Sequence, residues 1–168
     1  MGYMNGEELE ETLIFQDFIT LQLFQKLGWS VNQLASKKYN IEYGESLAGI
    51  EIKNDKRMKE TGNIYVELAE SHYEQNFVPS GINRDDNTLI WCIGDFDVAY
   101  LIVKKQLKFL CDNFQRYGFK KVQTDTSIGI LIPTSFLDKN DIYVLKKLDF
   151  KGGGNDLQDK DTDEASSV

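Results

Sequence analysis

A glutamate and a lysine stand two residues apart in residues 50–54, a short apolar run of sequence Ile-Glu-Ile-Lys-Asn. Side chains two apart share one face of a strand, so Glu51 and Lys53 point one way and the two isoleucines point the other way, into a core. Glu45 adds a second carboxylate across a bend flanked by glycines. Hard divalent cations prefer carboxylate oxygens, and a lysine beside such a cation can act on water or phosphate. The segment therefore carries the residues needed for metal-assisted phosphodiester hydrolysis.

Two further carboxylates extend this candidate site. Asp55 would share the face of Glu51 and Lys53, and it is the fallback ligand if Glu45 points to solvent. Glu67, on a later predicted strand, would bind a second metal ion or hold Lys53 in place. The alternative for the segment is a salt-bridged strand without chemistry, and the alternative for Glu67 is a paired or exposed strand residue.

Basic side chains follow the candidate strand and predict contacts to a phosphate backbone. Lys56, Arg57 and Lys59 come directly after it, and Lys37, Lys38 and Arg84 would lie near the same rim. Such clusters position phosphates without reading sequence. A solvated loop is the alternative. Acids at the start of the first predicted helix, Glu10 or Glu11, would complete the site from across the sheet.

The order of elements resembles the PD-(D/E)XK nuclease superfamily. Glu51-Ile52-Lys53 matches the (D/E)XK element of that family, on what reads as a central strand. Residues 59–67, 79–82 and 129–133, together with the strand that contains Trp91, are similar in layout to small phage-type members. The resemblance covers residues 8–135. The upstream Pro-Asp of the family is absent, and Glu45 stands where its aspartate is expected.

The resemblance implies an α/β fold with a restriction-endonuclease-like core, in which helices flank a central mixed β-sheet. It also implies a metal-dependent DNA endonuclease. Glu45, Glu51 and the backbone carbonyl of Ile52 would hold Mg²⁺ or Mn²⁺, and Lys53 would orient the attacking water or stabilise charge on the phosphorus. Cleavage of both strands by a chain of this size suggests a homodimer.

The loop at Ser80 and Gly81 resembles the family loop that lines the substrate groove. The glycine would permit close approach of a backbone. A plain turn is the alternative for these two residues.

Net charge supports a rival interpretation. The formal charge is -8, and residues 1–150 alone hold 17 basic and 22 acidic residues. Since Lys and Arg supply most non-specific affinity for nucleic acid, this balance disfavours a DNA-binding protein. The alternative is a catalytically inactive nuclease-fold protein that binds proteins or mimics DNA with its acidic surface. A subunit that needs a partner to bind DNA is a third hypothesis.

Composition predicts one domain over residues 1–150 and a disordered acidic tail over residues 151–168. The first residues lack the apolar run of a secretory signal, and no stretch approaches the roughly 18 apolar residues of a membrane helix. We therefore expect a cytoplasmic protein with no membrane partner. Cys92 and Cys111 fall in apolar patterns and are expected to be buried thiols.

Hydrophobic periodicity predicts most of the remaining elements. A helix is expected over 8–27, and three or four strands are expected between 29 and 69. After these, a hairpin is expected from strands over 88–93 and 98–103, and a helix is expected over 104–117. Two short strands over 119–122 and 127–132 and a helical turn from Pro133 complete the expected elements.

Overall fold

The structure is a computed structural model, and it describes residues 6–34, 36–71 and 76–151. The first half of the chain contains α1 Gly6–Leu27, α2 Lys37–Tyr43, β1 Ile50–Asn54, α3 Met58–Thr61, β2 Asn63–Ser71, β3 Phe77–Pro79 and the short 3-10 helix η1 Gly81–Asn83. The second half contains β4 Ile90–Gly94, β5 Val98–Val103, α4 Lys104–Asp112, α5 Phe114–Tyr117, β6 Lys120–Gln123, β7 Ser127–Pro133, α6 Thr134–Lys139, the 3-10 helix η2 Asp141–Tyr143 and β8 Lys146–Asp149.

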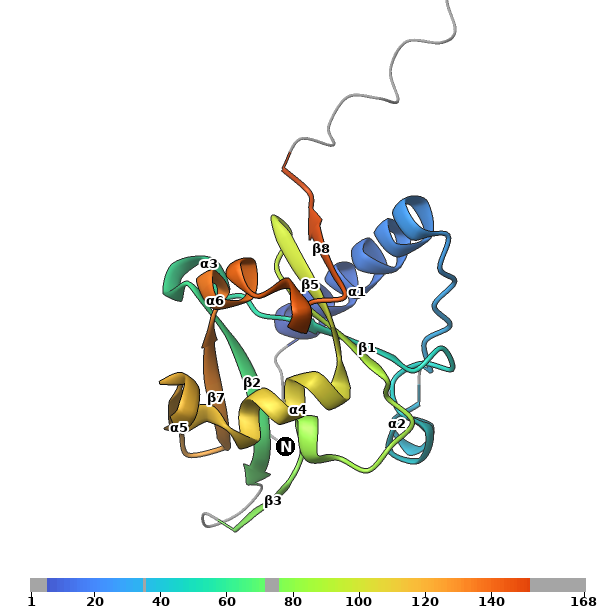
Figure 1. The fold of residues 1–168 in the computed structure, drawn as a ribbon. Helices are drawn as coiled ribbons and strands as arrows, with labels where there is room; N and C mark the ends of the chain where they lie inside the picture. The colour runs from blue at the N-terminus through green and yellow to red at the C-terminus, as the bar shows by residue number, and fades with distance from the viewer. Residues whose placement is uncertain (1–5, 35, 72–75, 152–168) are drawn as a thin grey trace, which may run out of the picture.

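The strands form two four-stranded sheets. The first is mixed, with the order β1-β4-β5-β8, and only its β1–β4 pair is parallel. The second is antiparallel, with the order β3-β2-β7-β6. The fold is therefore α/β, with a mixed and an antiparallel sheet flanked by helices (Figure 1).

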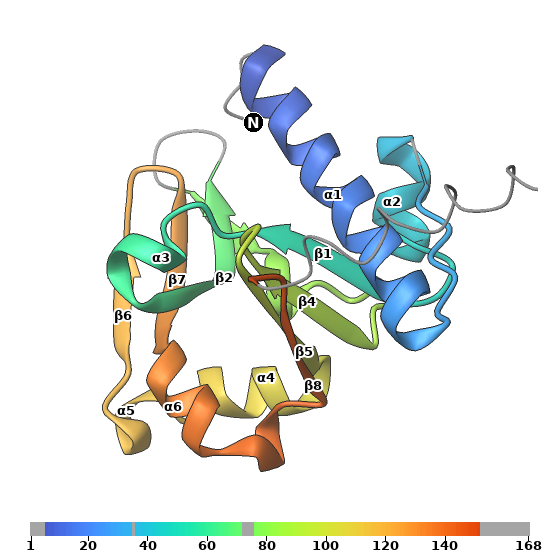
Figure 2. The same cartoon turned by 90° about the horizontal axis from the view of Figure 1, so that it is seen from above.

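The expected single central sheet is replaced by these two sheets. Between β1 and β2 the chain makes the short helix α3, which ends at Gly62 in the left-handed conformation with φ 67°. This turn carries β2 away from the free edge of β1, and β2 pairs with β3 and β7 instead. Figure 2 shows α1 on one side of the mixed sheet and β2, β7 and β6 on the other side.

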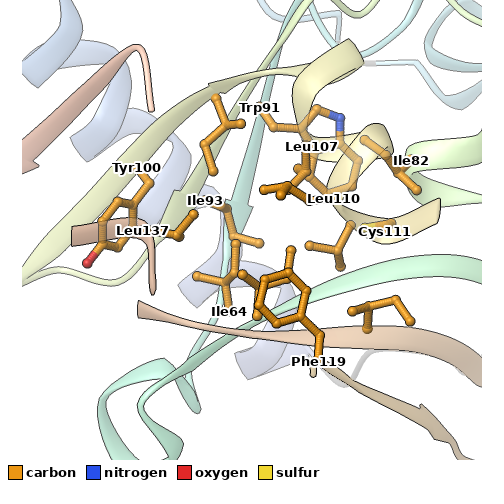
Figure 3. Close-up of a cluster of buried hydrophobic side chains, with 14 of the residues drawn as sticks. Ile64, Ile82, Trp91, Ile93, Tyr100, Leu107, Leu110, Cys111, Phe119 and Leu137 are labelled. Atoms are coloured by element: carbon orange, nitrogen blue, oxygen red, sulfur yellow. The ribbon is translucent and has the colours of Figure 1, made fainter. Parts of the chain in front are cut away.

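Two apolar cores hold these layers together. Phe15, Ile19 and Leu23, at helical spacing, turn one face of α1 against Ile50 and Ile52 of β1. The larger core lies between the two sheets and is closed by α4. Figure 3 shows its members, among them Ile64, Trp91, Ile93, Tyr100, Leu107, Leu110 and Phe119.

Both faces of β1 are therefore covered, and the face that carries Glu51 and Lys53 lies against the core between the sheets. The residues that pair with Glu51 and Lys53 on β4 are Trp91 and Ile93, which belong to the core between the sheets. Glu51 and Lys53 consequently lie at the margin of that core, at the edge strand of the mixed sheet.

Several predicted elements are confirmed. The first helix ends at Gly28, whose φ of 70° lies in the left-handed region that stops helices. The predicted hairpin is β4 and β5, and these strands occupy the two central positions of the mixed sheet. Both cysteines are buried, and burial raises the pKa of each thiol to about 12.

The expectation of three or four strands between residues 29 and 69 is wrong. The described residues of that range form two strands, two helices and an isolated bridge between Gln33 and Ser46. Ser36 accepts a hydrogen bond from Tyr39 N and so starts α2 in a segment that alternation alone had suggested as extended. The predicted helix over 104–117 is present, but it is divided at Asn113 into α4 and α5.

The predicted tail lies outside the described residues, apart from Lys151, whose ammonium is 3.0 Å from Asp97 Oδ2. Within the described ranges, no helix is both long enough and apolar enough to cross a bilayer.

We expect Ile19→Ala to destabilise the protein by about 2–5 kcal/mol, because it removes a fully buried side chain from the core under α1. The matched control is Ile14→Ala on the same helix, since Ile14 is 54% exposed and its loss should change stability by no more than about 0.5 kcal/mol. Urea unfolding of the two variants measures the difference. Equal losses would contradict the packing of α1 described above.

Candidate functional site

Along β1, the backbone N–H and C=O groups of successive residues point alternately toward β4 and toward the free edge of the sheet. The amide of Ile90 on β4 donates to the carbonyl of Gly49 at 3.0 Å, so the backbone groups of the odd-numbered residues point toward β4. Ile50 faces the other way, because its N–H and C=O both bond to the Ser46 hydroxyl. Ile52, two residues further along, therefore directs its carbonyl to the free edge of the sheet.

Lys53 joins two carboxylates at this edge. Its ammonium lies 2.7 Å from Glu45 Oε1 and 2.8 Å from Glu51 Oε1, and it lies 5.9 Å from the centre of the Trp91 ring. Desolvation acts to lower the pKa of Lys53, but the two carboxylates outweigh it and raise the pKa above its ordinary value. Lys53 is thus a cation at neutral pH, and its chemistry is that of a charge and a proton donor.

Glu51 is the buried member of this triad, with a side chain only 1% exposed. Its Oε2 accepts a hydrogen bond from the Thr88 hydroxyl at 3.3 Å, and its Oε1 lies 3.4 Å from Nη2 of Arg84. A buried carboxylate is costly unless it is paired, and here cations on two sides offset that cost.

Arg84 belongs in turn to a second ion cluster. Its Nε donates to Asp86 Oδ2 at 2.7 Å, and the ammonium of Lys104 donates to Asp86 Oδ1 at 2.8 Å. The side chain of Asp86 is fully buried. Burial acts to raise the pKa of Asp86, but the hydrogen bonds from Lys104 and Arg84 outweigh it and lower the pKa to about 2.

A cleft of about 430 Å³ opens beside these residues. Nine of the residues that the sequence predicted for the site line it, namely Glu51, Lys53, Asp55, Lys56, Arg57, Glu67, Ser80, Gly81 and Arg84. Two predicted metal ligands, Glu45 and Ile52, are not among the residues that line the cleft. Glu45 is joined to it only through its ion pair with Lys53, and Ile52 lies on the edge strand β1.

The far wall of the cleft is built around Glu67 on β2. The Ser80 hydroxyl donates to Glu67 Oε1 at 2.6 Å. Gly81 has a φ of 52°, and a Cβ there would lie 2.4 Å from the Glu67 carbonyl oxygen. Glycine is required at this position because η1 packs directly on β2, so the close backbone approach is to a strand of the protein.

Of the predicted basic residues, Lys56, Arg57 and Arg84 line the cleft, whereas Lys59 pairs with Asp97 at 2.8 Å. Lys56 forms an ion pair with Glu11 of α1, so this helix acid contacts the rim cation. Asp55 accepts a hydrogen bond from the Tyr65 amide at 2.6 Å and ties the end of β1 to β2, while burial raises its pKa. Arg57 is exposed.

Sequence reasoning missed Asp86, Thr88 and Lys104. The predicted hairpin could have indicated Lys104, because the second strand of a hairpin ends beside the start of the first strand. The Lys104 amide accordingly donates to the Leu89 carbonyl at 2.8 Å. Asp86 carried a weaker signal: its carboxylate caps the turn by accepting from the Thr88 amide at 3.0 Å.

The residues that the resemblance assigns to a metal ion offer one side-chain oxygen that is unpaired within the described ranges. Glu45 Oε2 is buried and has no hydrogen-bond partner among the described residues, so it is an acceptor oxygen still available to a cation. Together with Glu51 and the Ile52 carbonyl it supplies the hard oxygens that Mg²⁺ prefers. Histidine, cysteine and acidic side chains of the described ranges form no group of three or more that would hold a metal by themselves.

Compared with family models, curated proteins and solved structures, the chain matches none. The nuclease resemblance of the sequence therefore stays a prediction.

We expect acid to remove the stabilising effect of the Asp86 carboxylate. Its pKa falls from 3.8 to about 2 on folding, so its contribution is complete above the unfolded value and is lost as the pH falls from about 4 toward 2. This contribution amounts to about 2 kcal/mol. Urea unfolding as a function of pH should show the gap between wild type and Asp86→Asn narrowing over this interval.

The matched control is Asp85→Asn, which alters the exposed neighbouring carboxylate. Its stability should follow that of wild type over the whole pH range. A gap between wild type and Asp86→Asn that does not change with pH would contradict the charge pairing of Asp86.

Proposed function

We propose that the protein is a metal-dependent DNA endonuclease that hydrolyses phosphodiester bonds at the edge of β1. The observation that carries this proposal is the single ammonium of Lys53 between the carboxylates of Glu45 and Glu51, beside an open cleft. The match of Glu51-Ile52-Lys53 to the (D/E)XK element supports it, and it supports a restriction-endonuclease-like core as the finer description of the fold.

The protein groups would divide the work as follows. Glu45, Glu51 and the Ile52 carbonyl would hold Mg²⁺ or Mn²⁺, which when bound polarises the phosphate and lowers the pKa of water. Lys53 would donate to the attacking water or stabilise the negative charge that develops on phosphorus. Its raised pKa makes it unsuited to remove a proton.

Substrate would enter along the cleft. Lys56 and Arg57 at the rim would contact the DNA backbone, and Ser80 would fix Glu67 on the opposite wall. Since each chain carries one such triad, cleavage of both strands of a duplex would involve a homodimer.

The balance of charge in the cleft favours an enzyme over a DNA mimic. Its ionisable lining consists of four basic and four acidic residues, Lys53, Lys56, Arg57 and Arg84 against Glu51, Asp55, Glu67 and Glu70. A mimic needs a surface dominated by carboxylates, whereas this cleft is neutral on a chain whose overall charge is -8.

Nicking of a supercoiled plasmid in Mg²⁺ or Mn²⁺ tests the proposal. We expect wild type to nick, and both Lys53→Ala and Glu45→Gln to be slower by about 10²–10³-fold, because each removes a charge that acts on the transition state. The side chains of Lys53 and Glu45 are 37% and 20% exposed, and in Lys53→Ala the buried Glu51 keeps its contacts to Arg84 and Thr88, so both variants should fold.

The control variant is Lys147→Ala, which breaks a 2.8 Å ion pair with Asp138 outside the lining of the cleft. It should nick as wild type does, and EDTA should stop nicking by both wild type and Lys147→Ala. Equal nicking by wild type and Lys53→Ala would assign the activity to a contaminant and overturn the proposal.

A further inference from the structure

On the side away from the cleft, the guanidinium of Arg84 is held by the buried carboxylate of Asp86. Asp86 accepts from its Nε at 2.7 Å, and Lys104 donates both to Asp86 and to the Arg84 carbonyl, at 2.8 and 2.7 Å. The Thr88 amide holds the same Asp86 carboxylate at 3.0 Å. Arg84 has therefore lost much of the side-chain freedom that an exposed arginine keeps, so binding a ligand costs less entropy.

The other end of the guanidinium faces the cleft. Arg84 is 30% exposed and lines the cleft with Lys53 and Glu51. Its Nη2 makes only the long 3.4 Å contact to Glu51, and the described residues provide no hydrogen-bond partner for Nη1. An arginine fork with free terminal N–H groups matches the geometry of a phosphate.

The net charge of the groups around Arg84 determines whether an anion can bind beside its guanidinium. The linked groups around Arg84 are three carboxylates and three cations, Glu45, Glu51 and Asp86 with Lys53, Arg84 and Lys104. The network is therefore neutral by itself. A divalent cation on Glu45 and Glu51 would make it positive and would favour an anion beside Arg84.

We propose that Arg84 binds a backbone phosphate of the nucleic acid in the cleft, with Asp86 and Lys104 as positioning residues. This inference rests on the proposed function for the identity of the ligand. It gives Arg84, which the sequence placed only in a general basic rim and which lies 33 residues from Glu51, a defined phosphate-binding role with named positioning residues.

The test is binding of a short labelled DNA duplex in Ca²⁺ and in EDTA, measured by fluorescence anisotropy at several salt concentrations. We expect Arg84→Ala to bind at least about tenfold more weakly in Ca²⁺, because a charge-assisted hydrogen bond is lost. The slope of log Kd against log salt should also shrink by about 0.9, since one phosphate contact is removed.

Variants around Arg84 separate positioning from charge. Asp86→Asn should weaken binding while keeping the salt slope of wild type. The Arg84 guanidinium remains charged in this variant, but the Asp86 carboxylate no longer fixes its position. Arg84→Lys should also keep the slope and lose affinity, since lysine lacks the planar fork. The matched control is Arg116→Ala, an arginine that stacks on Tyr117 outside the cleft lining, and it should bind as wild type does.

Equal affinity and salt slope for wild type and Arg84→Ala would overturn the inference, as would the absence of wild-type binding in Ca²⁺. Arg84-dependent binding without any nicking in Mg²⁺ would overturn the proposed nuclease and leave the phosphate site standing. Thermal melting of each variant excludes loss of fold as the cause.

Discussion

The ammonium of Lys53 between Glu45 and Glu51 is the interaction on which the site depends. β1 is covered on both faces, so the Glu51 carboxylate is buried and needs cations and a hydroxyl to balance its charge. Buried ion pairs add little net stability compared with apolar residues of similar size. Stability alone therefore does not explain the triad. The function proposed above does, since Glu45 Oε2, which has no hydrogen-bond partner among the described residues, and the Ile52 carbonyl would then serve as metal ligands.

The separation into two sheets leaves β1 as an edge strand. The turn through α3 and Gly62 brings β2 across from β1, with the cleft beside them. Residues from β1, from the loop before β4 and from the start of α4 then meet in one network, in which Arg84 links Glu51 to Asp86.

Local patterns predicted what depends on local physics. The alternation in β1 placed Glu51 and Lys53 on one face, and Gly28 marked the end of α1. Glu45 could be predicted as a partner because only a short bend separates it from the strand. Asp86 and Lys104 could not, since their roles depend on the register of the hairpin and on which sheet β2 joins, which are set by long-range pairing. The segment before β1 was misread because a side-chain cap at Ser36 favours a helix over a strand.

A crystal structure of the protein grown with Mn²⁺ tests the central claim most directly, because anomalous scattering locates the ion without any assay of activity. We expect one Mn²⁺ shared by the carboxylates of Glu45 and Glu51, with Lys53 displaced from between them. An ion bound elsewhere, or none bound while Lys53 still joins the two carboxylates, would contradict a metal-dependent site at the edge of β1.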